Sequence, residues 1–344
     1  MASTRRITIR DVAKAAGVST TTVSDALSGN GRLPPATRRR VAAVAGRLGY
    51  RANPAARSLR GQRVGGIGLY LPEEAGNFAY YLEVAAGAAS EALAHGMALT
   101  LIPPCPDPAR LTAFPVDGFA VIDPVRHDPV VRAFSQLGIP VVTGERDLTP
   151  GADHAGLVEG DYRPAMISLL DHLAAQGAAR VALIAPGPET AWGLELRAAY
   201  QAWCIAGNRP ELLYDVPFKA SPELVHDAAM RALRAEPEPD AVISGIDGGA
   251  IGALVAAAEF GRRVPEDLLL ASCVDSPALR TCSPAITALD LRPEEMGRRL
   301  AALLHSLLEE TFPRGTVQNI HPRLVTRASS IRTERRWFLG ALTH

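Results

Sequence analysis

The sequence lacks the features of a secreted, membrane-bound or disulfide-rich protein. Its four cysteines among 344 residues are scattered without CxxC spacing, which argues against a disulfide framework or a zinc site. No window approaches about 18 uncharged apolar residues, so we expect no membrane-spanning segment. The first residues contain no apolar run of signal-peptide length, and Asp11 stands where a transit peptide avoids acids. We therefore expect a cytoplasmic protein with no membrane partner.

Catalytic and cofactor motifs are missing as well. The eight histidines show no His-x-x-x-His or HExxH spacing. The chain has no Gly-x-Ser-x-Gly, no Walker loop and no GxGxxG after the first expected strand. The sequence therefore predicts no catalytic residue, no metal site and no cofactor. An enzyme would require an acid–base pair that converges in a cleft.

The net charge of zero hides opposite charges in two parts of the chain. The first 63 residues hold thirteen Arg or Lys against two acids, a net of +11, which leaves 23 basic and 34 acidic residues and a net of −11 for the remainder. So large an asymmetry is typical of a module that binds a polyanion such as DNA, attached to an acidic body that the duplex repels.

Residues 8 to 50 have the pattern of three short helices around a tight turn. Thr8 and Asp11 can form a capping box, Gly17 ends the first helix, and Ser19 caps the second. The third helix begins at Pro34-Pro35. The residues expected to face the common core are apolar: Ile9, Val12, Ala13, Ala16, Val23, Leu27, Val41, Val44, Ala45 and Leu48. Two short helices joined by a glycine turn predict a helix-turn-helix.

Four segments carry a family resemblance: Ile9-Arg-Asp-Val-Ala-Lys-Ala-Ala-Gly-Val-Ser-Thr-Thr-Thr-Val-Ser24, Thr37-Arg-Arg-Arg-Val41, Leu48-Gly-Tyr50 and Asn53-Pro-Ala-Ala-Arg-Ser-Leu-Arg60. They resemble the lactose and galactose repressor family of bacterial transcription regulators. The resemblance spans the whole chain and implies an all-α helix-turn-helix DNA-binding domain followed by an α/β effector domain of two lobes, like those of periplasmic binding proteins. It also implies a homodimer on a palindromic double-stranded DNA operator and a small-molecule effector between the lobes.

In that family the second helix lies in the major groove, which implies that Thr20, Thr21 and Asp25 face base edges. Phosphate contacts are implied for Ser19, Thr22, Ser24 and Asn30. Asp25 departs from the family, which often has Arg at this position. An Arg would read guanine, whereas Asp can accept from cytosine N4 or orient a neighbouring Arg. The alternative is that Asp25 only discourages nonspecific binding.

Residues 52 to 60 resemble the hinge helix of the family, which folds against its dimer mate on DNA. The resemblance makes Leu59 a wedge in the minor groove, Ala56 its packing neighbour, and Asn53 and Arg57 neighbours of the DNA backbone. About nine residues are too few for a stable isolated helix, so its order must come from DNA and the partner chain. The alternative is an ordinary linker.

From residue 64 onward, short β-rich runs alternate with amphipathic helical stretches, which predicts parallel sheets with helices on both faces. The expected strands are 66–71, 98–102, 118–122, 140–142, 181–185, 241–244 and 268–273. The resemblance divides the chain into a headpiece (1–51), a hinge helix and linker (52–63), an effector-binding and dimerisation domain (64–332) and a tail (333–344). It places lobe one at about 64–161 with 290–319, and lobe two at about 162–289 with 320–332.

The effector candidates are side chains that follow these strands, because ligands in such sheets collect beyond the carboxyl ends of the strands. By resemblance, Arg197 would donate to effector hydroxyls, and Asp161 and Asp247 would accept from them. The full set is Asn77, Phe78, Asp123, Asp161, Trp192, Arg197, Asp247 and Asp275. The alternative roles are packing for the Trp and structural capping for each Asp or Arg.

Two departures from the family bear on the effector. Val274 stands where the family usually has the first of two consecutive Asp, which argues against an ordinary sugar, and the proline-rich segment 103–110 is too short for the usual second helix. The sequence predicts a sequence-specific DNA-binding repressor controlled by a sugar, a nucleoside or a related metabolite. The alternatives are a ligand-independent repressor or architectural protein with a degenerate sensor and, further away, a solute-binding protein or an enzyme.

Overall fold

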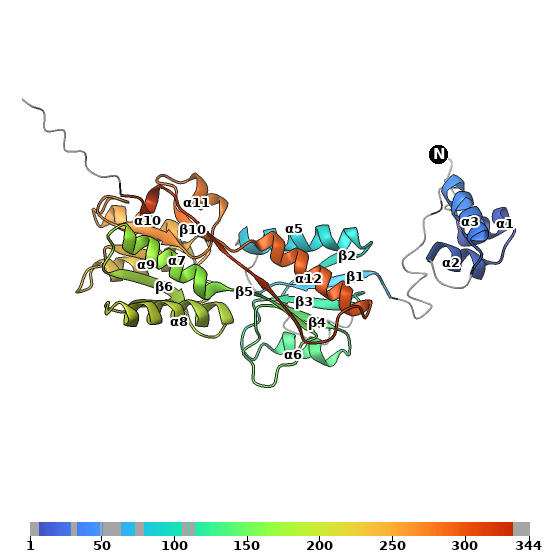
Figure 1. The fold of residues 1–344 in the computed structure, drawn as a ribbon, viewed down its shortest axis with the longest axis horizontal. Coiled ribbons are helices and arrows are strands. Elements are labelled where there is room, and N and C mark those ends of the chain that lie inside the picture. The colour runs from blue at the N-terminus through green and yellow to red at the C-terminus, as the bar shows by residue number, and fades with distance from the viewer. Residues whose placement is uncertain are drawn as a thin grey trace, which may run out of the picture. The chain divides into compact units, whose positions relative to one another are not determined.

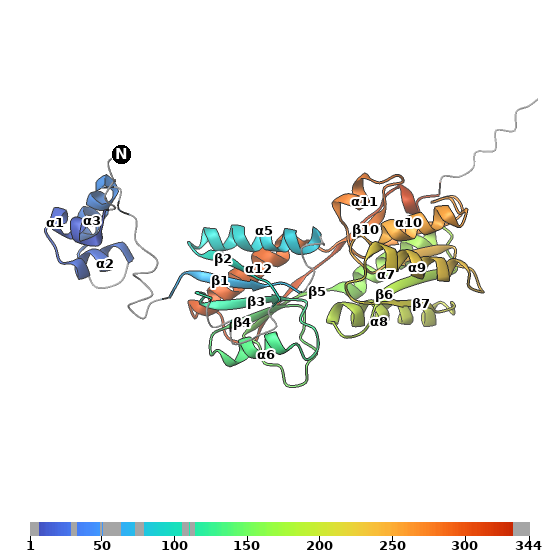
Figure 2. The same cartoon turned by 180° about the vertical axis from the view of Figure 1, so that it is seen from behind.

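The structure, a computed structural model, describes residues 7–28, 33–48, 50, 63–72, 79–104, 110 and 114–332. The chain forms two compact units, Met1–Val64 and Gly65–His344. Figure 1 and Figure 2 draw their elements from opposite sides. Each unit is described by itself.

The N-terminal unit consists of α1 (Ile9–Ala16), α2 (Thr20–Ser28) and α3 (Pro35–Leu48). At the predicted capping box, the backbone N–H of Thr8 donates to Asp11 Oδ2 at 2.8 Å. Gly17 ends α1 in the left-handed conformation, with φ of 64°. The Ser19 hydroxyl oxygen accepts from the backbone N–H of Thr22 at 3.0 Å and caps α2. These contacts confirm the predicted helix-turn-helix.

An apolar core joins the three helices. Its buried residues are Val12, Ala13, Ala16, Val23, Ala26, Val41, Val44 and Ala45. Leu27 was predicted to face this core, and that prediction is wrong, because its side chain is 37% exposed. Val23 and Ala26, three positions apart, occupy the inner face of α2. Leu27 is rotated by about 100° from Ala26 and by about 40° from Val23, so it lies at the edge of this face.

The larger unit contains two six-stranded sheets. The first has the strand order β11-β5-β4-β3-β1-β2, with β1 (Gly66–Tyr70), β2 (Ala98–Ile102), β3 (Gly118–Ile122), β4 (Val141–Gly144), β5 (Gly156–Gly160) and β11 (Thr316–Ile320). The second has the order β12-β10-β9-β8-β6-β7, with β6 (Val181–Pro186), β7 (Leu212–Val216), β8 (Ala241–Ser244), β9 (Leu269–Ser272), β10 (Thr287–Asp290) and β12 (Arg323–Val325). Among the described strands, β12 runs antiparallel to β10 and the other pairs are parallel.

Helices cover both faces of each sheet. As Figure 1 shows, α5 (Ala79–Ala94) and α12 (Pro293–Leu308) lie on one face of the first sheet and α6 (Pro129–Gln136) on the other. On the second sheet, α7 (Tyr162–Ala175) and α8 (Ala191–Ala206) pack on one face, and α9 (Pro222–Leu233) and α10 (Gly249–Glu259) on the other. The short α11 (Pro277–Thr281) and a 3-10 turn (Ala328–Ser330) follow β9 and β12. This architecture confirms the predicted fold class.

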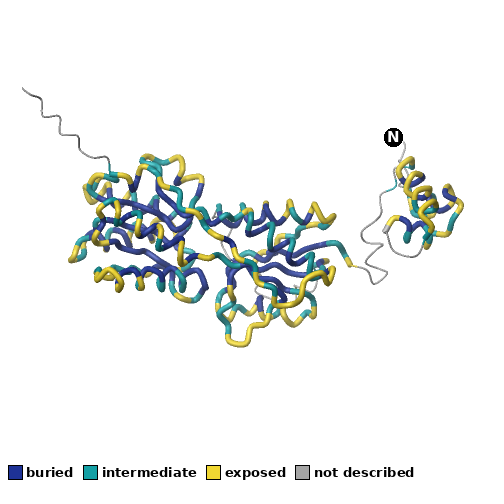
Figure 3. The backbone as a smooth tube through the Cα atoms, viewed as in Figure 1, coloured by how far each residue is buried: buried dark blue, intermediate teal, exposed yellow. Residues whose placement is uncertain are grey.

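Burial follows from this layering. The central strands β1, β3, β4, β6, β8 and β9 are buried along their whole length, as Figure 3 shows. Strands covered on both faces require near-continuous apolar sequences, which is why these runs were predictable. Where two helices pack closely, a glycine stands at the contact. A Cβ on Gly297 of α12 would clash with the carbonyl oxygen of Val84 in α5, so the two helices touch through their backbones.

The chain passes between the sheets three times: from β5 into α7, from β10 into α12, and from β11 into β12. No helix within the described ranges is long and apolar enough to cross a membrane. In the same ranges, no group of three or more His, Cys, Asp or Glu could hold a metal ion.

Candidate functional site

A pocket of about 50 Å³ lies between the two sheets, beyond the carboxyl ends of their strands. Its lining residues are Tyr80, Tyr81, Asp123, Tyr162, Trp192, Phe218, Lys219, Gly245, Ile246, Asp247, Val274 and Leu291. One water needs roughly 10–15 Å³ of such space, so the pocket holds only a few waters. A ligand of sugar size therefore requires the lining side chains or the lobes to move.

Two carboxyl groups of the lining, the buried Asp123 and the partly buried Asp247, have raised pKa values. Asp123 follows β3 with φ of 47° and accepts from the Tyr81 hydroxyl at 2.8 Å. Burial raises the pKa of Asp123 to about 6, although the Tyr81 hydrogen bond and the charge of Lys219 act to lower it. Asp247 follows β8 and accepts from the backbone N–H of Tyr80 at 3.1 Å. Burial raises the pKa of Asp247 to about 6 as well.

A third buried carboxyl group, Glu145, lies behind this lining. It follows β4 with φ of 78°, and its Oε1 accepts from the Tyr162 hydroxyl at 2.5 Å and from the backbone N–H of Gly160 at 3.1 Å. Burial and the nearby charge of Asp123 raise the pKa of Glu145 well above its usual value. The Tyr162 ring meets the Trp192 ring edge to face, with 4.7 Å between centroids. Aromatic side chains thus cover the buried acids.

The structure brings some of the predicted effector residues together and not others. Asp123, Trp192 and Asp247 line the pocket. Arg197 does not: its guanidinium donates to the carbonyl oxygen of Pro186 at 2.6 Å and pairs with Asp215. Three more candidates lie elsewhere or cannot be placed. The side chain of Asp161 is 47% exposed and lies beside His321, while Asn77 and Phe78 fall outside the described residues.

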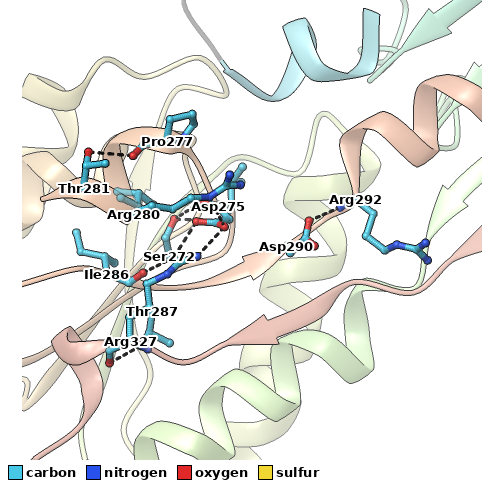
Figure 4. A network of polar contacts seen from close by, with 12 residues as sticks. Ser272, Asp275, Pro277, Arg280, Thr281, Ile286, Thr287, Asp290, Arg292 and Arg327 are labelled. Carbon is cyan, nitrogen blue, oxygen red and sulfur yellow. Dashed lines mark hydrogen bonds and ion pairs between the residues drawn. The ribbon is translucent and has the colours of Figure 1, made fainter. Parts of the chain in front are cut away.

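Asp275 belongs to a network of ion pairs rather than to the pocket lining (Figure 4). Arg327 donates to both of its carboxylate oxygens at 2.8 Å, and Arg280 donates to one of them at 3.0 Å. Arg327 also donates to the carbonyl oxygen of Ile286 at 2.6 Å. The Asp275 side chain is only 5% exposed, so the network ties the end of β9 to the segment after β12. Its neighbour in the chain, Val274, lines the pocket in its place.

Several site residues were not predicted from the sequence: Tyr80, Tyr81, Glu145, Tyr162, Phe218, Lys219, Gly245, Ile246 and Leu291. The tyrosines stand in the first turns of α5 and α7, and their direction depends on how those helices pack. One signal was available in the sequence. The chain has two lysines, Lys14 in the basic segment and Lys219 in the acidic body. A single lysine among many arginines could have singled out this position.

The predicted DNA contacts lie on α2 and around it. Ser19 and Thr21 are exposed, and Thr20, Thr22, Ser24 and Asp25 are partly exposed, whereas Val23 and Ala26 of the same helix are buried. The remaining predicted contacts, namely Asn30, Asn53, Ala56, Arg57 and Leu59, lie outside the described residues.

Two family models match separate parts of the chain. Residues 8–53 match the model described as bacterial regulatory proteins, lacI family, and residues 170–330 match a periplasmic binding protein-like domain. The chain thus combines a lacI-family helix-turn-helix domain with a periplasmic binding protein-like domain, as the sequence predicted. Its relatives are transcriptional regulators.

Relatives and solved structures extend this similarity over most of the chain. It is 29% identical over 313 residues to the HTH-type transcriptional regulator CelR of Thermobifida fusca, covering 87% of this chain and 91% of that protein. It is 29% identical over 341 residues to the HTH-type transcriptional repressor PurR of Klebsiella pneumoniae (strain 342), covering 94% and 96%. A CelR–cellobiose complex matches with a TM-score of 0.72 and 25% identity, covering 94% of this chain and all of that one. The lac repressor dimer bound to operator and the anti-inducer ONPF has the same fold, with a TM-score of 0.76, 21% identity and coverage of 95% and 100%.

Proposed function

We propose that this lacI-family regulator is a cytoplasmic repressor, not an enzyme, that binds a palindromic DNA operator as a homodimer. Residues 1–51 form the DNA-binding headpiece and 52–63 the hinge. Residues 64–332 bind a small effector between two lobes, 64–161 with 290–319 and 162–289 with 320–332. The effector is a sugar, a nucleoside or a related metabolite, and its binding changes the affinity for the operator.

The observation that carries the sensor proposal is the pocket. Its lining comes from both sheets, so a ligand held there contacts both lobes at once. The lining combines aromatic faces with a few carboxylate oxygens, which is the composition of sites for small hydroxylated rings. The relatives point the same way, since one is named a repressor and the CelR structure contains cellobiose.

The contacts between the sheets offer a route from ligand to operator. Asp247 accepts from the backbone of Tyr80, and Arg146 at the end of β4 donates to Glu195 of α8 at 2.5 Å. A ligand shifts the balance between lobe arrangements only by the difference in its affinity for them. Because Asp247 takes part in one of these contacts, a ligand that competes for its carboxylate changes the observed arrangement of the lobes directly.

The test starts from operator selection with a random double-stranded DNA pool, followed by fluorescence anisotropy with the selected site. A metabolite panel of sugars and nucleosides is then added to the protein–operator complex. We expect one member to change operator affinity, and Asp247→Ala to abolish that change. A metabolite that binds the protein without moving operator affinity would contradict the proposed control. It would favour the ligand-independent repressor instead.

A further inference from the structure

The pocket has more acidic than basic side chains in and behind its lining. Asp123 and Asp247 line it, Glu145 lies behind it, and Lys219 is the one cationic residue among the twelve lining residues. Both lining acids are close to the Tyr81 hydroxyl, because the charges of Asp123 and Asp247 each raise its pKa. A low-dielectric site with this charge favours a cationic ligand or bound protons.

Three nearby arginines do not neutralise these acids, because each pairs with another carboxylate. Arg197 pairs with Asp215 and with backbone carbonyls of β6. Arg280 and Arg327 pair with Asp275. None of these three arginines lines the pocket.

The backbone holds two of the acids in an uncommon conformation. Asp123 has φ of 47° and Glu145 has φ of 78°, both in the left-handed region that side chains other than glycine rarely occupy. They follow the neighbouring strands β3 and β4, and each accepts from a tyrosine hydroxyl. Strained residues that gather at one pocket point to a ligand-binding role for it.

Five aromatic side chains complete the lining: Tyr80, Tyr81, Tyr162, Trp192 and Phe218. Aromatic faces attract cations, and this attraction grows when the cation is removed from water. The remaining contacts are apolar, with Val274, Ile246 and Leu291 on the wall. Aromatic rings next to buried carboxylates match a protonated amine on a small ring better than a ring that carries only hydroxyl groups.

We propose that the effector is a small ring compound with one protonated amine, whose ammonium group is bound by Asp123 and Asp247 and whose ring packs on the aromatic lining. This inference rests on the proposed sensor function and narrows its ligand class. An ammonium group compensates the buried negative charge, which a neutral hydroxyl cannot do.

Calorimetry of the full chain with matched pairs tests the class: D-glucosamine against D-glucose, D-galactosamine against D-galactose, and tyramine against its hydroxyl counterpart tyrosol. We expect an amine to bind at least about tenfold more tightly than its hydroxyl partner, since a charged hydrogen bond exceeds a neutral one by roughly 1.4 kcal/mol or more. Asp123→Asn should reduce this preference to within about threefold, because the amide cannot compensate the charge. Asp153→Asn removes an exposed acid outside the pocket and should keep the preference.

Proton exchange gives a second readout near pH 6, measured in two buffers of different ionisation enthalpy. Asp123, with a pKa of about 6, is about half protonated there. The titratable groups that face it are Tyr80, Tyr81, Glu145, Tyr162 and Lys219. A bound ammonium lowers the pKa of this carboxyl, so amine binding should release protons, whereas proton uptake overturns the proposal.

Different results contradict the amine class and the sensor function. Hydroxyl partners that bind as tightly as the amines overturn the amine class. If such a neutral compound also changes operator affinity, the proposed sensor function stands. An amine that binds as expected but leaves operator affinity unchanged contradicts the sensor function and keeps the ligand class.

Discussion

Replacement of Asp123 by asparagine should stabilise the protein above pH 6. The buried carboxyl has a pKa raised from 3.8 to about 6, so ionising it in the folded state is costly. Asparagine has the same shape, keeps an oxygen that accepts from the Tyr81 hydroxyl, and tolerates the positive φ of 47° at least as well as aspartate. The variant therefore removes the charge with little other change.

The sign of the pH dependence follows from proton binding. Between pH 3.8 and about 6 the folded protein holds a proton on Asp123 that the unfolded chain has lost, so wild-type stability falls as pH rises through this window. The shift of about 2 units corresponds to about 3 kcal/mol, most of it lost between pH 4 and pH 8. Asp123→Asn lacks this loss, so its advantage over wild type should grow by about 2–3 kcal/mol from pH 4 to pH 8.

Urea unfolding followed by tryptophan fluorescence measures this difference. All three tryptophans, Trp192, Trp203 and Trp337, lie beyond residue 64, so the signal comes from the larger unit and not from the helix-turn-helix. The comparison needs the free energy of unfolding of both proteins at pH 4, 6 and 8. A variant that gains nothing at pH 8 relative to pH 4 would show that the Asp123 carboxylate is compensated in the folded state, against the burial argument.

Three further outcomes follow from the DNA module and the ion-pair network. A chain that begins at Val64 should lose operator binding, and binding that survives this truncation would contradict the prediction. Operator affinity of the full chain should fall on the order of 10³-fold or more between about 50 and 200 mM salt. Leu59→Ala should weaken specific binding by roughly 2 kcal/mol in gel-shift titrations with little effect on random DNA, and equal losses on both would exclude a wedge role. Arg327→Ala removes the bidentate partner of the buried Asp275 and should lower the free energy of unfolding in urea by about 3–5 kcal/mol. A loss below about 1 kcal/mol would show that Arg280 alone compensates the Asp275 charge.

The predictability of each strand from the sequence depended on its burial. Seven strands were placed within two residues of their observed bounds, and they are mostly apolar runs buried on both faces or apolar at an edge. The five missed strands are β5, β7, β10, β11 and β12. β7 and β11 lie next to a single neighbour at the end of a sheet and carry polar residues, and β12 has three residues. Their pairing depends on partners far along the chain, such as β5 for β11.

The site was predictable mainly at the strand ends, and among the described helix residues of the lining the sequence predicted only Trp192 of α8. Asp123 and Asp247 followed from the rule that ligands collect beyond the carboxyl ends of parallel strands. The same rule gave Arg197 and Asp275, whose side chains turn to the Pro186 carbonyl and to Arg327, respectively. Which way a strand-end side chain turns depends on its ion-pair partners, and those are distant in the sequence.

The stability and binding of Asp123→Asn together decide what the buried acid does. A carboxyl that lowers stability above pH 6 and binds nothing is only a structural cost, and its removal should leave every ligand response unchanged. A carboxyl that binds a cationic ligand lowers the stability of the free protein, because the charge that compensates it is present only in the complex. This is a trade-off between stability and function. The variant should then gain stability and lose its preference for amines at the same time. Gain of stability with an intact amine preference would assign the ammonium group to Asp247 alone.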